Sequence, residues 1–404
     1  MIQFKQGEDP VRLLSVCEQK QLIKKIMKSK AYFSRKSKVW KKLASLGYYV
    51  GVWYYRKSFL VDQLKMKKER SKGTSVDKNE ILRIWNGIKV DNGWFQFYNS
   101  VLREGNNSFD ARYIPLDIQY CYIDDWFNDT ESALILDDKN MYDLYFYDVN
   151  RPKTIGRIIN GAFFDEHYSK LTIDELVERC VKSENVILKP TVFSSTGNGI
   201  EFWNNNDGEQ TLESFLREHN NYIIQELIHQ HDEINKIYKD SVNSIRIVTC
   251  NFDGETEVLS SVIRMGVNGS RLDNASRGGM FCGINDDGSL KKYGYTKDGD
   301  ARTSHPQGAI FSECHIPNYD KCKELCVRLS NRFLRISKLI SWDLAVDNNG
   351  DPVLIEVNLC YGGADIHQIA NGPLFKEKTE TILNRVFVQK KKYRFFNRLF
   401  SLYK

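Results

Sequence analysis

Two carboxylates and an amide near residue 350 have the types and the spacing of a divalent-cation site. The segment 341–363, SWDLAVDNNGDPVLIEVNLCYGG, contains Asn349-Gly350, the preferred central pair of a two-residue type I′ hairpin turn. A hairpin centred there places Asp343 directly opposite Glu356, with Asn358 on the same face because side chains alternate along a strand. The other face is apolar, with Leu344, Val346, Val353, Ile355 and Val357.

Facing carboxylates repel each other. At a separation of roughly 5 Å and an effective dielectric constant of about 20, the cost is about 3 kcal/mol. A hard divalent cation bound by oxygen atoms would offset this cost, and a donor set of oxygens alone favours magnesium over zinc. The alternative is a solvent-facing hairpin with hydrated acids, which the following Cys-Tyr-Gly-Gly does not favour. The sequence therefore predicts a Mg²⁺ site at Asp343, Glu356 and Asn358.

A second segment, 184–203, has the residue types that contact phosphate. In ENVILKPTVFSSTGNGIEFW, a predicted strand carries Lys189, and the small residues 194–199 lead into another strand. Glycines let backbone amides approach a phosphate closely, and an ammonium group supplies the opposite charge. An ordinary glycine hairpin explains this segment equally well. A third segment, 222–233, reads as a strand with the composition of any core strand.

Other catalytic motifs are missing from the sequence. It contains no GxSxG, and no Gly is followed by Lys, which excludes a nucleophile elbow and a P-loop. Phe202 stands where a dinucleotide fingerprint starting at Gly197 needs its third glycine. The nine cysteines are scattered without a CxxC pair, which supports neither a disulfide framework nor a zinc ribbon and indicates a reducing compartment.

Taken in order, these segments resemble the ATP-grasp superfamily. More narrowly, they are similar to the sugar-transfer-associated ATP-grasp family, relatives of the glutamate-ligase type. The likeness covers roughly residues 110–385. It is carried by DKNMYDLYF (138–146), LKPTVFSSTGNGI (188–200), IIQELI (223–228), NSIRIVT (243–249), RLDNASRGGM (271–280), SHPQG with a later IP (304–317) and the 341–363 hairpin.

The resemblance implies roles for individual residues. Those expected to bind ATP, through its phosphates, adenine or ribose, are Lys139, Lys189, Ser195, Gly197, Gly199, Glu226, Leu227 and Glu233. Arg246 is expected to bind the transferred phosphate or a substrate carboxylate, while Arg264 lines the acceptor side with Asp273 and Asn274. Related ligases carry an arginine two residues before the metal aspartate, where this sequence has Ser341. Arg246 or Arg264 would then neutralise the acyl phosphate.

The activity that the resemblance implies is ATP-dependent carboxylate–amine ligation through an acyl phosphate, with ATP and Mg²⁺ as cofactors. The substrate would be a sugar-linked or small-molecule carboxylate with an amine, in surface polysaccharide biosynthesis. Two alternatives remain open at this stage. One is a kinase-like phosphotransferase that attacks with a hydroxyl group, and the other is a non-catalytic ATP-binding scaffold of a polysaccharide assembly.

The elements that position these residues predict an α+β protein. Strands rich in β-branched residues are expected at 222–228, 244–250, 257–265 and 341–346, and helices at 172–183, 210–220 and 320–337. Mostly hairpin-length links favour an α+β body of two ATP-grasp subdomains over a doubly wound parallel sheet. The expected domains are a basic helical extension (1–75), the N-terminal and central subdomains (76–240), the C-terminal subdomain with the metal hairpin (241–388) and a basic amphipathic tail (389–404).

Charge is distributed unevenly along the 404 residues. Residues 1–75 hold 19 Lys/Arg against 5 Asp/Glu, and 389–404 hold 6 basic residues and no acid, which leaves 33 basic against 47 acidic residues in 76–388. An acidic body argues against a nucleic-acid enzyme with a basic cleft. With neither a signal-peptide pattern nor a spanning apolar run, the sequence predicts a cytoplasmic protein whose basic ends contact an anionic membrane surface at its inner face. A helical extension that packs on the body is the alternative for 1–75.

Overall fold

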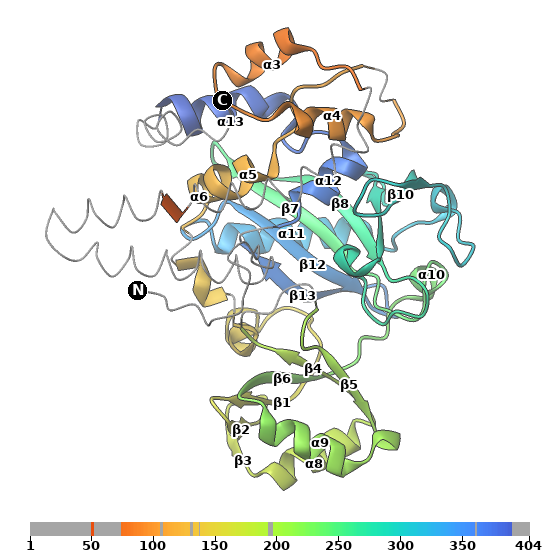
Figure 1. The fold of residues 1–404 in the computed structure, drawn as a ribbon. Coiled ribbons are helices and arrows are strands. Elements are labelled where there is room, and N and C mark those ends of the chain that lie inside the picture. The colour runs from red at the N-terminus through yellow and green to blue at the C-terminus, as the bar shows by residue number, and fades with distance from the viewer. Residues whose placement is uncertain are drawn as a thin grey trace, which may run out of the picture. The chain divides into compact units, whose positions relative to one another are not determined.

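The computed structural model describes residues 50–51, 74–105, 108–129, 132–136, 138–192, 197–359 and 362–389 (Figure 1). The chain divides into two compact units, Met1–Phe97 with Glu380–Lys404 and Tyr98–Thr379. Nearly all of the predicted basic extension and tail lies outside the described residues. Among the described helices, none combines the length and the apolar character that a membrane crossing requires.

The first unit is helical in its described part. Helix α3 (Lys78–Trp85) begins at Asp77, whose carboxylate accepts hydrogen bonds from the first backbone amides and so caps the helix. Trp85 packs its ring edge-on against Phe95 of α4 (Asn92–Ser100). The chain returns to this unit through α13 (Thr379–Leu383) and the π-helix η8 (Asn384–Gln389), and Glu380 of α13 pairs with Arg83 of α3.

A six-stranded antiparallel sheet forms one part of the second unit, with strand order β3-β2-β1-β6-β4-β5. Its strands are β1 (Thr154–Ile159), β2 (Ala162–Phe164), β3 (Lys170–Leu171), β4 (Asn185–Pro190), β5 (Glu201–Asn204) and β6 (Asn221–Glu226). Helices α8 (Ile173–Lys182) and α9 (Glu209–Glu218) contact each other beside this sheet and bury leucines against it (Figure 1). A capping box between Thr172 and Glu175 starts α8.

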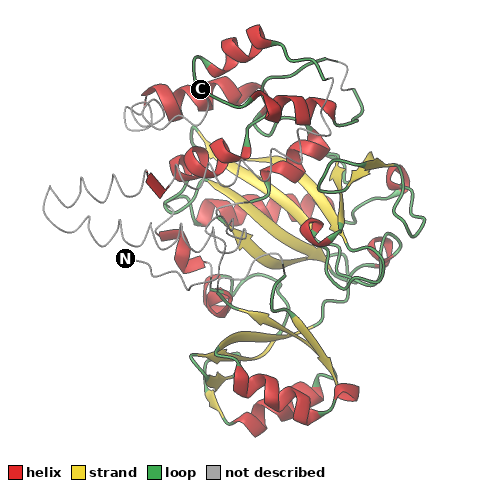
Figure 2. Cartoon of the chain, in the orientation of Figure 1, coloured by secondary structure: helices red, strands yellow, loops and turns green. Residues whose placement is uncertain are grey.

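A seven-stranded antiparallel sheet forms the larger part of this unit, with strand order β11-β10-β9-β8-β7-β12-β13 (Figure 2). Its strands are β7 (Ile245–Phe252), β8 (Glu255–Met265), β9 (Met280–Ile284), β10 (Leu290–Tyr295), β11 (Ala301–Arg302), β12 (Leu339–Val346) and β13 (Pro352–Asn358). Helix α11 (Tyr319–Arg332) packs on it through buried Leu329 and Cys326. The indole of Trp342 donates to Thr249 and to Ser330 of α11, at 3.0 and 3.1 Å.

Further short helices lie before, between and after these strands in the sequence. They are α5 (Leu116–Ile118), the π-helix η1 (Gln119–Ile123), α6 (Asp124–Phe127), η2 (Ser132–Leu136), η3 (Lys139–Met141), α7 (Tyr142–Tyr145), η4 (Asn205–Asp207), α10 (Asp232–Asn235), η5 (Ala275–Arg277), η6 (Phe311–Glu313), α12 (Ala364–Asn371) and η7 (Lys376–Lys378). Every named strand pairs antiparallel, so the predicted α+β class is confirmed. The predicted domain border at 240/241 falls in the chain between β6 and β7 and stays a prediction.

The predicted pairing of Asp343 with Glu356 is confirmed, but the predicted turn is wrong. Gly350 has a left-handed φ of 80°, whereas Asn349 has no positive φ, so the turn is not type I′. The amide of Asp347 donates to the carbonyl of Asp351 at 3.0 Å, which closes a three-residue loop. This loop shifts the register by one residue, and a bulge after Asp343 shifts it back.

Candidate nucleotide and metal site

Asp343 lies at the centre of a row of charged residues on adjacent strands. It is directly opposite Glu356 of β13 on one side and Arg246 of β7 on the other. Arg246 binds it through both carboxylate oxygens, with Nε to Oδ1 at 2.7 Å and Nη2 to Oδ2 at 2.6 Å. Arg264 of β8 adds a contact from Nη2 to Oδ2 at 3.1 Å. Antiparallel register thus gathers residues that are far apart in the sequence.

The two arginines keep Asp343 ionised although it is only 2% exposed. Burial alone would raise the pKa of Asp343, but the charges of Arg246 and Arg264 outweigh burial and lower it to about 2. Burial disfavours the charged form of Arg246 and would lower its pKa. The charge of Asp343 outweighs burial and raises the pKa of Arg246 above its usual range. This bidentate pair is therefore a fixed, fully charged part of the site.

Two lysines approach the same row, one from η3 and one from the smaller sheet. Lys139 of η3 donates from Nζ to Oε1 of Glu356 at 2.8 Å, and its backbone amide donates to the carbonyl of Thr191 just beyond β4. Lys189 of β4 is buried, and its ammonium donates to Gln225 of β6 at 3.2 Å. Burial, followed by the charge of Lys139, lowers the pKa of Lys189 to about 8, against the opposing effect of Glu356.

These contacts change the argument for magnesium. The repulsion expected between Asp343 and Glu356 is already offset, because arginine holds the first acid and lysine the second. Within the described residues Glu356 forms its hydrogen bond through Oε1, and Asn358 contacts Asp343 only through Nδ2, at 3.5 Å. Glu356 and Asn358 therefore each keep an oxygen atom that fits a hard cation, while both oxygens of Asp343 are engaged by arginine.

The glycine segment is only partly described, because Ser195 lies outside the described residues. Gly197 and Gly199 both have left-handed φ values, 72° and 73°. A Cβ at Gly199 would lie 2.8 Å from Pro190, so both backbone shape and space require glycine there. Asn198 between them accepts a hydrogen bond from Arg277 of η5.

The expected adenine and ribose residues make contacts outside this row. Glu226, at the end of β6, pairs with Lys153 at 2.9 Å and donates from its amide to the carbonyl of Lys153. Leu227 follows directly. Glu233 of α10 pairs with Lys236 one turn later, at 2.6 Å, and is half exposed. Within the described residues, none of these bonds joins them to the row of Asp343, so their nucleotide roles stay predictions.

Of the residues expected on the acceptor side, Asp273 lies beside Arg264. The guanidinium of Arg264 donates to the hydroxyl of Ser244 at 2.5 and 2.9 Å, and its Nη2 lies 3.6 Å from Asp273. Asp273 in turn accepts a hydrogen bond from the backbone amide of Ser244 at 3.1 Å. Asn274 caps η5 by accepting from Ser276. Asp273 therefore positions Arg264.

Sequence reasoning missed His367 of α12. This residue is fully buried, and its Nδ1 lies 2.9 Å from the hydroxyl of Ser260. Its Nε2 has no hydrogen-bond partner in the described structure. Burial, followed by the charge of Arg246, lowers the pKa of His367 to about 3. A histidine in the apolar helix after Gly362-Gly363 was the only signal in the sequence.

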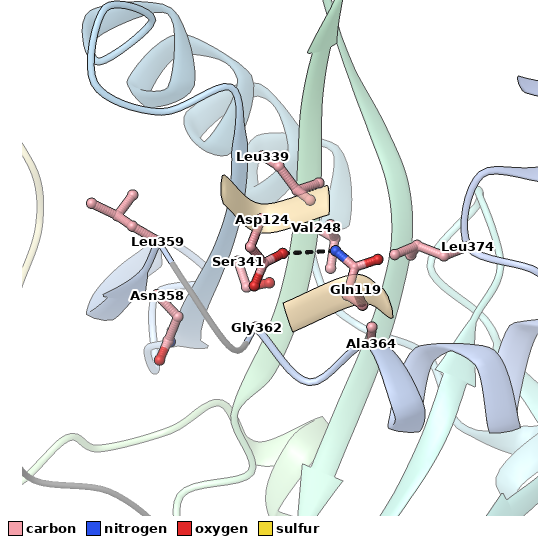
Figure 3. A pocket seen from close by; sticks show the side chains of 10 residues that line it. All are labelled: Gln119, Asp124, Val248, Leu339, Ser341, Asn358, Leu359, Gly362, Ala364 and Leu374. Carbon is pink, nitrogen blue, oxygen red and sulfur yellow. Dashed lines mark hydrogen bonds between the residues drawn. The ribbon is translucent and has the colours of Figure 1, made fainter. Parts of the chain in front are cut away.

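Ser341 lies beside a cavity of about 20 Å³ that adjoins Asn358 (Figure 3). Gln119 and Asp124 line the cavity, and the Gln119 amide donates to Asp124 at 2.7 Å. Gly362 also lines the cavity. A Cβ added at Gly362 would lie only 2.1 Å from the hydroxyl of Ser341. A space of this size holds about one water molecule, so an arginine side chain does not fit at position 341.

A comparison with known protein families finds a match in the C-terminal half of the chain. Residues 209–384 match the model of the family described as sugar-transfer-associated ATP-grasp. The resemblance to ATP-grasp proteins is confirmed. This match includes Arg246, Arg264 and the whole hairpin, whereas Lys139 and Lys189 precede it. None of the curated proteins matches the sequence.

Solved ATP-grasp structures show a distant likeness. Carboxyaminoimidazole ribonucleotide synthase from Aspergillus clavatus, complexed with ATP, is 12% identical, with 55% of this chain and 44% of that chain covered and a TM-score of 0.34. The L-amino acid ligase from Bacillus licheniformis is 13% identical, with 64% and 48% covered and a TM-score of 0.36. D-alanyl-alanine synthetase A from Vibrio cholerae is 12% identical, with 64% of each chain covered and a TM-score of 0.35. The chain spans less than half the length of the first two.

Proposed function

We propose that this chain is an ATP-dependent carboxylate–amine ligase that forms an amide through an acyl phosphate. The observation that carries the proposal is the convergence of Lys139 and Lys189 on the row formed by Glu356, Asp343 and Arg246. The row combines cations for a phosphate with oxygen donors for a metal. The match of residues 209–384 to an ATP-grasp family supports the same assignment.

Lys139 and Lys189 would bind the phosphates of ATP. Each lies close enough to the other for the charge of Lys139 to lower the pKa of Lys189, so the pair carries an unfavourable repulsion. A triphosphate would offset that repulsion, because its negative charge stabilises both ammonium groups. Gly197 and Gly199, in the loop after β4, would let backbone amides approach the same phosphates.

Glu356 and Asn358 would hold magnesium, which supplies charge neutralisation between the β- and γ-phosphates. Asp343 would serve mainly to hold Arg246 and Arg264 in place, since its two oxygens are already bound by them. The substrate carboxylate attacks the γ-phosphorus, the bond to the β,γ-bridging oxygen breaks, and ADP leaves. The amine then attacks the acyl carbon, loses a proton and displaces inorganic phosphate.

Arg246 and Arg264 would neutralise the acyl phosphate. In this chain the space beside Ser341 does not admit an arginine, whereas Arg246 and Arg264 reach the neighbouring Asp343 from the next two strands. A fixed guanidinium stabilises charge that develops in a transition state because it needs no reorganisation. We assign the substrate to sugar or amino-acid substituents of surface polysaccharide, because the matching family is described as associated with sugar transfer.

Hydroxylamine trapping tests the proposal without knowledge of the natural amine. The purified chain would be incubated with ATP, Mg²⁺, hydroxylamine and a panel of uronic acids and amino acids. A ligase gives a hydroxamate together with stoichiometric ADP and phosphate. A phosphotransferase gives ADP and a stable phosphorylated product with no phosphate release, and a scaffold binds ATP without turnover. Glu356→Gln is expected to abolish hydroxamate formation, whereas Glu201→Gln, an exposed acid of β5, is expected to leave it unchanged.

A further inference from the structure

A second pocket, of about 360 Å³, lies in the same unit and has no residue in common with the site described above. Strand β10, the end of helix α12, residues 103–105, Asp110 and Tyr113 line it. Its size is that of a small-molecule site. Nothing in the proposed ligase chemistry uses it.

Among the described residues, no acid is bound to the cations of this pocket. Arg103 donates to the carbonyls of Ile369 at 3.1 Å and Tyr98 at 2.5 Å, and to the hydroxyl of Tyr113, so neutral groups fix its guanidinium. Lys291 of β10 also lines the pocket, and the described residues give its ammonium neither a hydrogen bond nor an ion pair. The pocket therefore presents two positive groups at its wall.

Two acids, Glu104 and Asp110, also line the pocket, but neither is bound to these cations within the described residues. Asp110 is held by Arg112, with contacts of 3.0 Å from Nε to Oδ1 and 2.8 Å from Nη2 to Oδ2. Glu104 is exposed and is the weakest of the influences on Lys291. Burial, followed by the positive charge of Lys376, lowers the pKa of Lys291, with Arg103 acting in the same direction. A bound anion would relieve this repulsion, as a phosphate would at the lysine pair of the nucleotide site.

Aromatic rings give the pocket rigid walls. Lys291, Tyr293 and Tyr295 are alternate residues of β10, and all three line the cavity. An irregularity in the pairing of β10 with β9 occurs between Leu290 and Gly294 and re-aims this stretch. Tyr113, which also lines the pocket, stacks on Tyr98 at 4.9 Å and is buried, as is Tyr295. Tyr293 is partly exposed, and a flat tyrosine face with a polar edge suits the ring of a sugar.

Gly283 of β9 makes the position of Lys291 possible. A Cβ there would lie 2.9 Å from Cδ of Lys291 and 2.3 Å from Oδ1 of Asn371. The amide of Asn371 in turn bonds Ser260, the same hydroxyl that contacts His367 of the first site. Helix α12 thus connects the two sites through one serine.

We propose that this pocket binds a monosaccharide-sized ligand that carries a phosphate or carboxylate group. Arg103 and Lys291, neither bound to an acid within the described residues, select the anionic group, and Tyr293 contacts the ring. The site is separate from the nucleotide site, so its occupancy does not depend on the proposed ligase reaction.

Calorimetric titration of the full chain tests the pocket. Glucose 1-phosphate, glucuronate, inorganic phosphate and glucose are the probes, each with and without saturating ADP and Mg²⁺ to separate binding at the nucleotide site. The sugar phosphate or glucuronate is expected to bind at least tenfold more tightly than glucose, and the tighter of the two identifies the anionic group. Inorganic phosphate alone should bind more weakly than the sugar phosphate, because it lacks the ring.

Variants of β10 decide whether binding occurs at this pocket. Lys291→Gln is expected to weaken binding of the preferred sugar anion at least tenfold. Lys292→Gln removes the same charge from the next, exposed position and should change the affinity less than twofold. Unchanged binding in Lys291→Gln, or equal affinity for glucose, would overturn the proposal. Failure of ADP to bind would count against the ligase function and leave this result standing.

Discussion

At the scale of single residues, Lys189 offers a direct test of nucleotide binding. Its ammonium is buried and donates to the side-chain amide oxygen of Gln225, whereas Glu356 is paired with Lys139. Lys189→Met is therefore expected to weaken ATP binding at least tenfold while the protein stays folded. Fluorescence titration with an ATP analogue would measure the affinity. Lys170→Met, an exposed lysine of the same sheet, is the control, and equal affinity in both variants would remove Lys189 from the site.

Lys189 also predicts a dependence of stability on pH. Burial lowers its pKa to about 8 from an ordinary value of 10.5. Between these values the unfolded chain binds the proton more strongly than the folded protein, so the free energy of unfolding should rise with increasing pH. The rise should be present in the wild type and missing in Lys189→Met. Urea denaturation of both proteins between pH 7 and pH 10.5 measures it, and parallel curves would contradict the shift.

Glu356→Gln is predicted to lower stability in the absence of ligands. Facing carboxylates alone would make this substitution stabilising, since it removes a repulsion of about 3 kcal/mol. In the structure, however, Glu356 is the partner of Lys139 and the nearest opposing charge to Lys189. Neutralising Glu356 removes a negative charge that acts on both lysines, and the Lys139–Glu356 pair is only partly exposed. A decrease of about 1 kcal/mol is expected from thermal unfolding, and an increase would show that the repulsion dominates.

At the scale of elements, the β12–β13 hairpin shows what the sequence could predict and what it could not. Alternation of apolar residues and the Asn-Gly pair were enough to place Asp343 opposite Glu356. The predicted turn type is wrong, because the loop has three residues. Asp343 still lies opposite Glu356 because two local features cancel: the loop shifts the register by one position and the bulge restores it. Side-chain periodicity determines which face a residue occupies, whereas a single turn residue does not determine loop length.

Substitutions in this turn separate the two geometries. Gly350 has a φ of 80°, and a Cβ there would lie 2.5 Å from Nδ2 of Asn318, so Gly350→Ala is expected to cost about 1–2 kcal/mol. Asn349 has no positive φ, and Asp347 holds its backbone amide at 2.9 Å, so Asn349→Ala should change stability by less than about 0.5 kcal/mol. A type I′ turn would make both substitutions costly. Chemical denaturation of the two variants decides between them.

The partners of Asp343 could not be predicted from its own hairpin. Arg246 comes from β7, 97 positions earlier in the chain, and reaches Asp343 only because β7 pairs with β12 at that register. Strand order within a sheet depends on long-range packing, which local patterns do not encode. The same limit applies to His367, whose helix α12 packs on β8 and β9. Arg246 was identified as a site residue, but its binding of Asp343 was not foreseen.

At the scale of the whole molecule, the charge distribution separates two tasks. The acidic body carries both proposed sites, and in each of them a second positive charge lowers the pKa of a lysine. The basic ends hold 25 of the 58 Lys and Arg residues. The attraction of charged chain ends to a surface depends on how many charges lie near that surface, and it requires no fixed fold. Small-molecule recognition in the body and attachment through the ends can therefore be tested independently.

The basic ends are predicted to bind anionic membranes in a salt-sensitive manner. Residues 1–75 carry a balance of +14, and the tail 389–404 adds six positive charges interleaved with aromatic residues. Each basic residue near an anionic surface contributes about 1 kcal/mol, and this attraction falls as salt shortens the Debye length. Flotation with phosphatidylglycerol vesicles should recover the protein at low salt and lose it at high salt, while neutral phosphatidylcholine vesicles should not bind it at any salt concentration. Replacing the six tail cations with glutamine should reduce recovery without changing ATP binding, because the tail carries none of the proposed site residues. An absence of flotation at low salt would instead favour an extension that packs on the body.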